Sequence, residues 1–224
     1  NNHKDNITMK KSFILASLVM ASTSMMATNL EYFGGIDLSR ADAHVKDTVN
    51  LTGGSVNLGG TSYNTVGSIS DSYSSDDTAP AYKLGVILDE THRIYLKYGK
   101  YDGENSSEMK LTTLNYDYMF SNLKNDLKIV PYVGTFLGHG KLETEIGNGS
   151  GTVYGVDAGF VVPITKNIEF DFNLAYMKSN IDASTSWSNI NGTYGNSTLT
   201  NVSGSYEVEV RNATIANFGI NFRF

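Results

Sequence analysis

Apolar and polar residues alternate with a period of two along much of the chain. The clearest run is ANFGINFRF at residues 216–224, in which every second residue is apolar and three of these are phenylalanine. Successive side chains of a β-strand point to opposite faces, so this pattern predicts a strand with one apolar face. In a soluble protein that face needs a second sheet to pack on, whereas in a membrane barrel it contacts lipid.

Seven further segments repeat the alternation, and each has about the 9–11 residues that a tilted strand needs to cross a bilayer. The predicted strands cover residues 30–40, 81–89, 93–101, 110–120, 128–138, 152–162, 167–176 and about 205–224. Segment 128–138 is ambiguous, because apolar residues occur on both of its faces. We predict that Val130, Tyr132 and Phe136 face outward, rather than the alternating set that includes Val133.

Short and longer connections alternate between these strands. The short connections are residues 90–92, 121–126 and 163–166, and the others are 41–80, 102–109, 139–151 and 177–204. This asymmetry is typical of transmembrane β-barrels, which have tight turns on the periplasmic side and larger loops outside. The sequence therefore predicts an all-β fold, an eight-stranded antiparallel up-and-down transmembrane β-barrel with both termini on the periplasmic side.

The two longest connections, 41–80 and 177–204, are rich in Ser, Gly, Asn and Thr. The apolar runs within 49–58 are too short to span a membrane, so we predict a hairpin that rises above it. Residues 55–78 are interpreted either as part of such a hairpin or as a disordered loop tip. We also expect the external half of the last strand to pair with residues 177–190.

A targeting segment precedes the predicted strands. Residues 9–27, MKKSFILASLVMASTSMMA, have a positive start, an apolar centre and small residues before the cut, which is the layout of a secretory signal peptide. We predict cleavage after Ala27, with Ala21 as the alternative. The apolar centre is too short for a spanning helix. The predicted organisation is therefore 1–27 as an upstream extension and signal peptide and 28–224 as the barrel.

Composition narrows the function classes further. The chain has no cysteine, which excludes disulfides, cysteine-based zinc sites, thiol catalysis and a lipoprotein anchor. Its net charge is −6, and no basic stripe is present, so nucleic acid is not an expected partner. Glycine is frequent (22 residues) and proline rare (3 residues), which favours strands and polar turns over helices.

Charged residues alternate along the chain with the apolar ones, so they fall on the opposite face, which is predicted to point into the barrel. The predicted lumen charges are Glu31, Asp37, Lys83, Asp89, Arg93, Lys97, Asp117, Asp157, Glu169, Asp171, Arg211 and Arg223. An eight-stranded barrel is only wide enough for side chains to fill it, and an unpaired buried charge costs several kcal/mol. We therefore predict a plug of paired charges, with a narrow cation-preferring pore as the alternative.

Candidate catalytic chemistry is sparse. The histidines are scattered, so we expect no metal site and no cofactor. One enzyme hypothesis places His139 at the external mouth, near Ser150 or Ser179, as in lipid-modifying barrels. Serine is so common in these loops that we expect no enzyme. Trp187 and Tyr194 are loop aromatics that either pack the loop or contact a partner.

Three sequences carry a resemblance to a known family. They are the C-terminal FGINFRF, the opening LEYFGGIDLS and the mid-chain PYVGTFLGHG. With the signal peptide and the eight alternating segments, the chain resembles the small porin-like or OmpA/OmpX-type outer-membrane β-barrel family. The resemblance is one of pattern across the mature chain, and its specific part is the C-terminal signature Phe218, Ile220, Phe222 and Phe224.

The resemblance implies a place in the outer membrane of a Gram-negative bacterium. It also implies insertion by the barrel-assembly machinery, which recognises a terminal strand ending in Phe, and outer-membrane lipid as surroundings. We expect a monomer with a structural or porin-like role and a largely plugged lumen. The alternative is an adhesin or receptor whose partner binds the extracellular loops 41–80 and 177–204.

Overall fold

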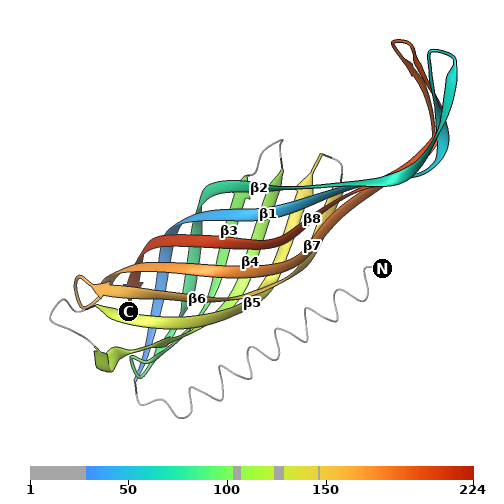
Figure 1. Cartoon of the computed structure of the whole chain (residues 1–224). Coiled ribbons are helices and arrows are strands. Elements are labelled where there is room, and N and C mark those ends of the chain that lie inside the picture. The colour runs from blue at the N-terminus through green and yellow to red at the C-terminus, as the bar shows by residue number, and fades with distance from the viewer. Residues whose placement is uncertain (1–28, 103–106, 124–128, 146) are drawn as a thin grey trace.

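The chain folds into a closed barrel of eight antiparallel strands, each paired with its neighbours in chain order (Figure 1). This computed structural model describes residues 29–102, 107–123, 129–145 and 147–224, so the predicted signal peptide lies outside the described residues. The strands are β1 Leu30–Leu58, β2 Thr61–Leu88, β3 His92–Asp102, β4 Glu108–Met119, β5 Val130–Thr144, β6 Gly147–Pro163, β7 Ile168–Tyr194 and β8 Ser197–Arg223. A short 3-10 helix, η1 Ser121–Leu123, follows β4. Within the described ranges, no helix is long and apolar enough to cross a membrane.

The first and last strands close the barrel. β1 pairs with β8 from Phe33 opposite Arg223 to Leu58 opposite Ser197. Backbone groups left unpaired in lipid are costly, so a sheet that spans a membrane must be closed in this way. The predicted fold class and strand number are confirmed.

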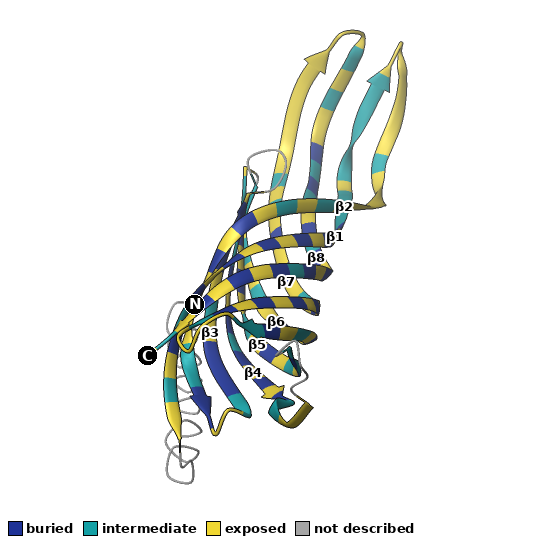
Figure 2. Ribbon diagram, turned by 90° about the vertical axis from the view of Figure 1, so that its left-hand side faces the viewer, coloured by how far each residue is buried: buried dark blue, intermediate teal, exposed yellow. Residues whose placement is uncertain are grey.

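Buried and exposed residues alternate along every strand of the barrel (Figure 2). Aliphatic residues such as Leu84, Leu96 and Leu174 form the exposed outer band. Two aromatic girdles flank this band, as expected at the two membrane interfaces. The exposed girdle residues are Tyr82, Tyr98, Tyr154 and Tyr176 on the external side, and Tyr32, Tyr118, Phe170, Phe222 and Phe224 on the periplasmic side.

The predicted orientation of β5 is wrong. Val130, Tyr132 and Phe136 are buried in the lumen, whereas Val133 and Leu137 are 49% and 60% exposed on the outer face. The two buried rings lie against glycines of β6: a Cβ at position 159 would meet Tyr132, and one at position 155 would meet Phe136. The space left by these glycines accommodates the rings inside the barrel.

Four strands continue far beyond the other four on the external side (Figure 1). Residues 44–58, 61–78, 180–194 and 197–210 form a four-stranded sheet in the order β2-β1-β8-β7, here called the extension. Both long connections predicted as loops are therefore mostly strand, and the disordered reading of residues 55–78 is wrong. The expected pairing of the external half of β8 with β7 is confirmed, for example between Val210 and Ile181.

Candidate functional site

The periplasmic half of the lumen is built around Arg93. This residue is fully buried, and its Nε donates to Asp117 Oδ2 at 2.7 Å. Its Nη1 donates to Asp171 Oδ2 at 3.0 Å and lies 3.7 Å from Glu169. The guanidinium stacks 4.5 Å from the ring centroid of Tyr132. Arginine suits this position because its planar fork binds several carboxylates and also stacks on aromatic faces.

Other cations connect the remaining lumen acids into one network. Lys83 Nζ lies 2.8 Å from both Asp37 and Asp171, and Lys97 Nζ lies 2.9 Å from Asp37. At the periplasmic mouth, Arg223 contacts Glu169 at 2.5 Å and Glu31 at 3.4 Å. The ion pairs therefore run without a break from the mouth to the middle of the barrel.

Two residues that we predicted in the lumen lie elsewhere. Asp89 is exposed in the turn after β2, where its Oδ1 accepts a hydrogen bond from the backbone N–H of Asn29 at 3.0 Å. Arg211 is exposed at a register shift of β8 and pairs with Glu209 at 3.1 Å. The turn ends the alternation before Asp89, and the shift breaks it at Arg211, so counting every second residue failed at both places.

Asp157 differs from the other lumen acids. Its carboxylate accepts a hydrogen bond from Asn173 Nδ2 at 2.7 Å, and the ion pairs of the described residues do not include it. Its Oδ1 and the Oδ1 of Asp117 are buried without a hydrogen-bond donor, and both lie over Gly134, where a Cβ would collide with them. The glycine therefore leaves room for two carboxyl groups that face each other.

Uncharged polar residues complete the network, and the sequence prediction missed them. Asn217 bonds to Ser39 and Asn173, and it accepts a hydrogen bond from Lys97 Nζ at 2.6 Å. Asn221 Nδ2 donates to Glu169 at 2.9 Å. These residues share the inward face of their strands with the predicted charges. That parity was the available signal, but our interpretation used it only for charged residues.

The external half of the lumen is apolar. Its buried residues come from all eight strands and pack into one cluster: Ala41, Ala43, Val45, Ala79, Tyr101, Met109, Leu111, Phe136, Leu142, Val153, Ala175, Met177, Ile181, Ala183, Val208, Val210, Ala213 and Ile215. The alternating pattern did not predict this layer, because small and aliphatic residues occur on both faces of the strands. The barrel is therefore closed at two levels, by paired charges below and by apolar packing above.

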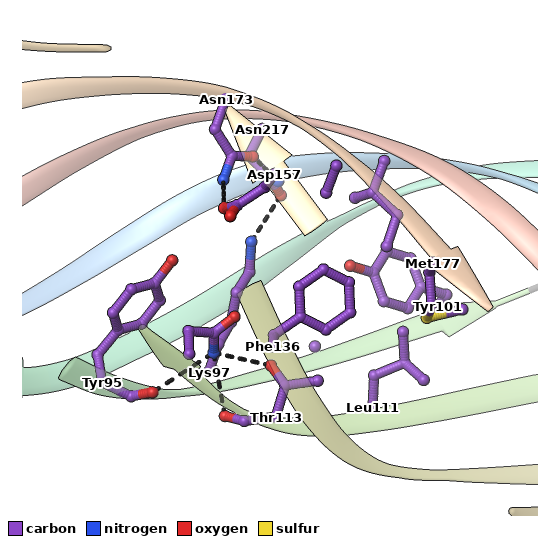
Figure 3. A pocket seen from close by; sticks show the side chains of 14 residues that line it. Tyr95, Lys97, Tyr101, Leu111, Thr113, Phe136, Asp157, Asn173, Met177 and Asn217 are labelled. Carbon is purple, nitrogen blue, oxygen red and sulfur yellow. Dashed lines mark hydrogen bonds between the residues drawn. The ribbon is translucent and has the colours of Figure 1, made fainter. Parts of the chain in front are cut away.

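A small cavity lies where the two layers meet (Figure 3). Lys97, Tyr95 and Asp157 line its polar side, and Phe136 and Met177 line its apolar side. Its volume is about 40 Å³. A water molecule requires roughly 10–15 Å³ of such space, so the cavity suits a few waters and is too small for a solute.

The structure does not assemble the proposed His139 site. His139 is exposed on the outer face of β5, opposite Thr112 of β4 and Thr152 of β6. In the described part of the chain, no hydrogen bond joins it to Ser150 or Ser179. Among these same residues, no group of three or more His, Asp or Glu side chains is arranged to hold a metal ion.

The extension has two chemically different faces, which can be followed from the strand register. Four side-by-side rows on one face are Tyr73-Val45-Val210-Ile181, Asp71-Asp47-Val208-Ala183, Ile69-Val49-Tyr206-Thr185 and Gly67-Leu51-Gly204-Trp187. The opposite face carries the rows Ser72-Lys46-Glu209-Asp182, Ser70-Thr48-Glu207-Ser184 and Ser68-Asn50-Ser205-Ser186. We call these the apolar face and the polar face of the extension.

A hydrogen bond ties two strands of the apolar face together. The hydroxyl of Tyr206 donates to Asp47 Oδ2 at 2.5 Å. Partial burial raises the pKa of Tyr206 to about 12, and the bond to Asp47 adds to this shift. The neutral tyrosine thus provides a donor for a carboxylate that would otherwise interrupt an apolar surface.

Comparison with known proteins identifies the fold. No protein-family model matches the chain, and no curated protein sequence matches it. The crystal structure of Neisserial surface protein A superimposes with a TM-score of 0.53 at 13% identity, covering 88% of this chain and 99% of that one. The chain has the fold of a small outer-membrane β-barrel. The outer membrane protein OprG from Pseudomonas aeruginosa superimposes more loosely, with a TM-score of 0.45 at 14% identity over 84% of this chain and 96% of that one.

The barrel's C-terminal signature lies on its outer surface. Phe218, Ile220, Phe222 and Phe224 all project outward and are exposed, as the alternation predicted. β8 lies between β7 and β1, so the signature sits at the seam where the sheet closes. This placement puts the signature where a last strand must add to close the barrel.

Proposed function

We propose that this barrel is a structural anchor that conducts neither ions nor solutes, performs no catalysis, and holds the extension at the cell surface. The observation that supports this function is the double closure of the lumen. A conducting path would have to pass both the buried ion pairs around Arg93 and the apolar cluster around Phe136 and Met177.

Energetics favour a permanent plug over a gated pore. Separating a buried ion pair costs about 3–5 kcal/mol, and the charges around Arg93 share partners, so opening would break several pairs together. The apolar layer adds a second barrier, because its side chains offer an ion few polar partners. A narrow cation-preferring pore is therefore the less favoured reading.

Single-channel recording tests the closed lumen. The refolded protein, shown to be inserted by its heat-dependent gel shift, is expected to give no step currents in a planar bilayer. A matched variant, Arg93→Gly, removes the largest side chain of the charged layer but leaves the apolar layer intact. It is expected to give no step currents either. Reproducible steps from the unmodified protein would overturn the proposal.

We propose as a second candidate function that the extension binds a partner outside the cell, as an adhesin or receptor does. The observation in its favour is the folded sheet itself. At about 3.3 Å per residue, segment 61–78 alone carries roughly 50–60 Å of strand beyond the barrel. Such a rigid platform presents side chains at fixed positions, which suits recognition.

Cell binding tests this second function. Cells that display the full protein are compared with cells that display a shortened barrel, in which residues 48–70 and 184–207 are each replaced by an Asn-Gly turn. Attachment to surfaces or to other cells is expected to fall with the shortened barrel at equal surface amounts. Equal attachment of both cell types would overturn the binding role and would leave the anchor role untouched.

A further inference from the structure

The apolar face of the extension keeps its character to the tip, although three strands change register on the way. Residue 54 is inserted in β1 between Thr52 and Ser55, and β7 and β8 shift near 187–192 and 199–203. Beyond the shifts, Tyr63, Val56, Leu199 and Gly192 are cross-strand neighbours.

These shifts determine which face the tip residues occupy. One extra residue in a strand exchanges its two faces. Without the insertion, Val56 and Leu58 would point to the polar face, away from Tyr63. With it, both lie on the same face as Leu51 and Val49. The irregularities therefore preserve a continuous apolar surface, which a solvated loop would not require.

The outer part of this surface is uncovered in the single chain, whereas the two rows nearest the barrel contribute buried residues to the apolar cluster of the lumen: Val45, Val208, Val210, Ile181 and Ala183. Ile69 is 72% exposed and Tyr194 is 88% exposed, and Leu58, Tyr63 and Tyr73 are exposed as well. The face is also nearly free of charge: its acids are Asp47, which binds the Tyr206 hydroxyl, and Asp71. The lysine and most acids of the extension lie on the polar face instead.

The size of the face matches a protein interface. From Val49 outward, four strands about 4.8 Å apart, over ~10 residues of about 3.3 Å each, present roughly 600 Å². Specific protein interfaces bury from about 600 Å² upward on each partner. Two sheets of this kind pack face to face about 10 Å apart, as in a β-sandwich. Asp47 and Asp71 lie in a row next to the barrel, and from Val49 outward the face carries no charge, so two copies meet there without electrostatic repulsion. Symmetric pairs are the commonest assemblies of soluble proteins.

We propose that the apolar face of the extension docks against the same face of a second copy of this chain. The two sheets then form a β-sandwich outside the membrane, with the polar faces turned to water. This proposal rests on the binding role proposed for the extension and names its partner. If the chain is instead a monomer, as expected from the sequence, the crosslinking experiment described next gives no dimer.

The absence of cysteine in the chain allows a clean test by single-cysteine crosslinking. Val49→Cys and Leu51→Cys place a thiol at the centre of the apolar face, and Thr48→Cys and Asn50→Cys are matched controls on the polar face. With a short bismaleimide, the purified protein in detergent is expected to give a covalent dimer for the first two variants and at least fivefold less for the controls. Equal crosslinking on both faces, or none on either, would overturn the proposal.

A second variant separates docking from folding. Val49→Asp places a charge on the face, and it is expected to sediment as a monomer at concentrations where the unmodified protein sediments as a dimer. Its heat-dependent gel shift should be unchanged, because the barrel lies below the substitution. If the unmodified protein is itself a monomer while the shortened barrel loses cell attachment, the extension binds a different partner. In that case self-docking fails and the binding role stands.

Discussion

At the scale of single residues, two lumen aspartates differ in the partners that surround them. Asp171 accepts hydrogen bonds from Lys83, Arg93 and Tyr132, at 2.8, 3.0 and 2.7 Å. Asp157 has the neutral amide of Asn173 as its donor and faces the carboxyl of Asp117. A buried carboxylate is stabilising only where cations and donors replace the water that it lost.

The same isosteric substitution should therefore have opposite effects at the two positions. Asp171→Asn leaves two cations short of a carboxylate and is expected to lower the free energy of unfolding by about 3–5 kcal/mol. Asp157→Asn removes a poorly compensated charge and provides a donor for Asp117, so we expect a gain on the order of 1 kcal/mol. Equilibrium urea unfolding in lipid vesicles measures both. Equal losses for the two variants would show that Asp157 has a cationic partner of its own.

Tyr206 provides a pH-dependent readout of the extension. Its pKa is raised to about 12 by burial and by its bond to Asp47, against about 10 for an unfolded tyrosine. The stabilising neutral form is thus fully present below about pH 10 and is lost as the pH rises toward 12. The tyrosinate absorbance of the unmodified protein minus that of Tyr206→Phe is expected to titrate with a midpoint near 12. A midpoint near 10 would show that the bond to Asp47 does not persist in solution.

At the scale of the strand, the β1 insertion depends on one of two adjacent glycines. Gly54 has a φ of 102°, and a Cβ there would meet backbone atoms of Asn201 and Val202 of β8. Gly53 has nothing within 4 Å of the corresponding position. The two positions are therefore a matched pair for testing whether the register shift is required.

We expect Gly54→Val to disrupt the tip of the extension and Gly53→Val to leave it unchanged. Strain of this kind costs about 1–3 kcal/mol, which is comparable to the stability of a local hairpin. Amide hydrogen exchange is expected to accelerate about tenfold or more in residues 52–58 and 197–203 of the first variant only. Equal protection in the two variants would mean that the tip tolerates another register.

The strands were predictable from the sequence to different degrees. Period-two alternation located all eight, because a lipid-facing and a filled face differ along most of each strand. The sequence did not predict which face of β5 points outward, because its aromatic residues suit either lipid or the lumen. The orientation is decided by the space above Gly155 and Gly159 of the neighbouring strand β6. Alternation within β5 carries no information about β6. The same holds for the lumen. The sequence predicted most of its charged residues, but it did not predict the apolar layer that lies on the same inward face.

The extension shows a signal that the sequence did contain. Serines at 68, 70, 72 and 74 alternate with Ile69, Asp71 and Tyr73, which is strand periodicity within a segment that its composition assigns to a loop. Polar composition predicts exposure, but it does not exclude a strand whose backbone is paired. In this segment β1 provides that pairing for the whole length of β2 beyond the barrel.

At the scale of the whole molecule, the barrel and the extension share strands but have separate structural supports. The barrel closes through β1 and β8 between Phe33 opposite Arg223 and Ala43 opposite Ala213, all below the extension. The apolar layer of the lumen includes residues as far out as Ala183 and Val208. A shortened chain that keeps these residues retains every contact that closes the barrel.

We therefore expect the shortened barrel, with residues 48–70 and 184–207 each replaced by an Asn-Gly turn, to fold and insert. The turns follow Asp47 and Ala183, so the rows that seal the lumen remain, and two-residue Asn-Gly turns suit antiparallel hairpins. Its heat-dependent gel shift in detergent is the measurement, with the full chain as reference and a chain lacking 218–224 as the negative control. A shortened chain that migrates identically boiled and unboiled would show that the extension is needed to close the barrel. The extension would then be part of the folding unit, and its apolar face would have to be interpreted as structural.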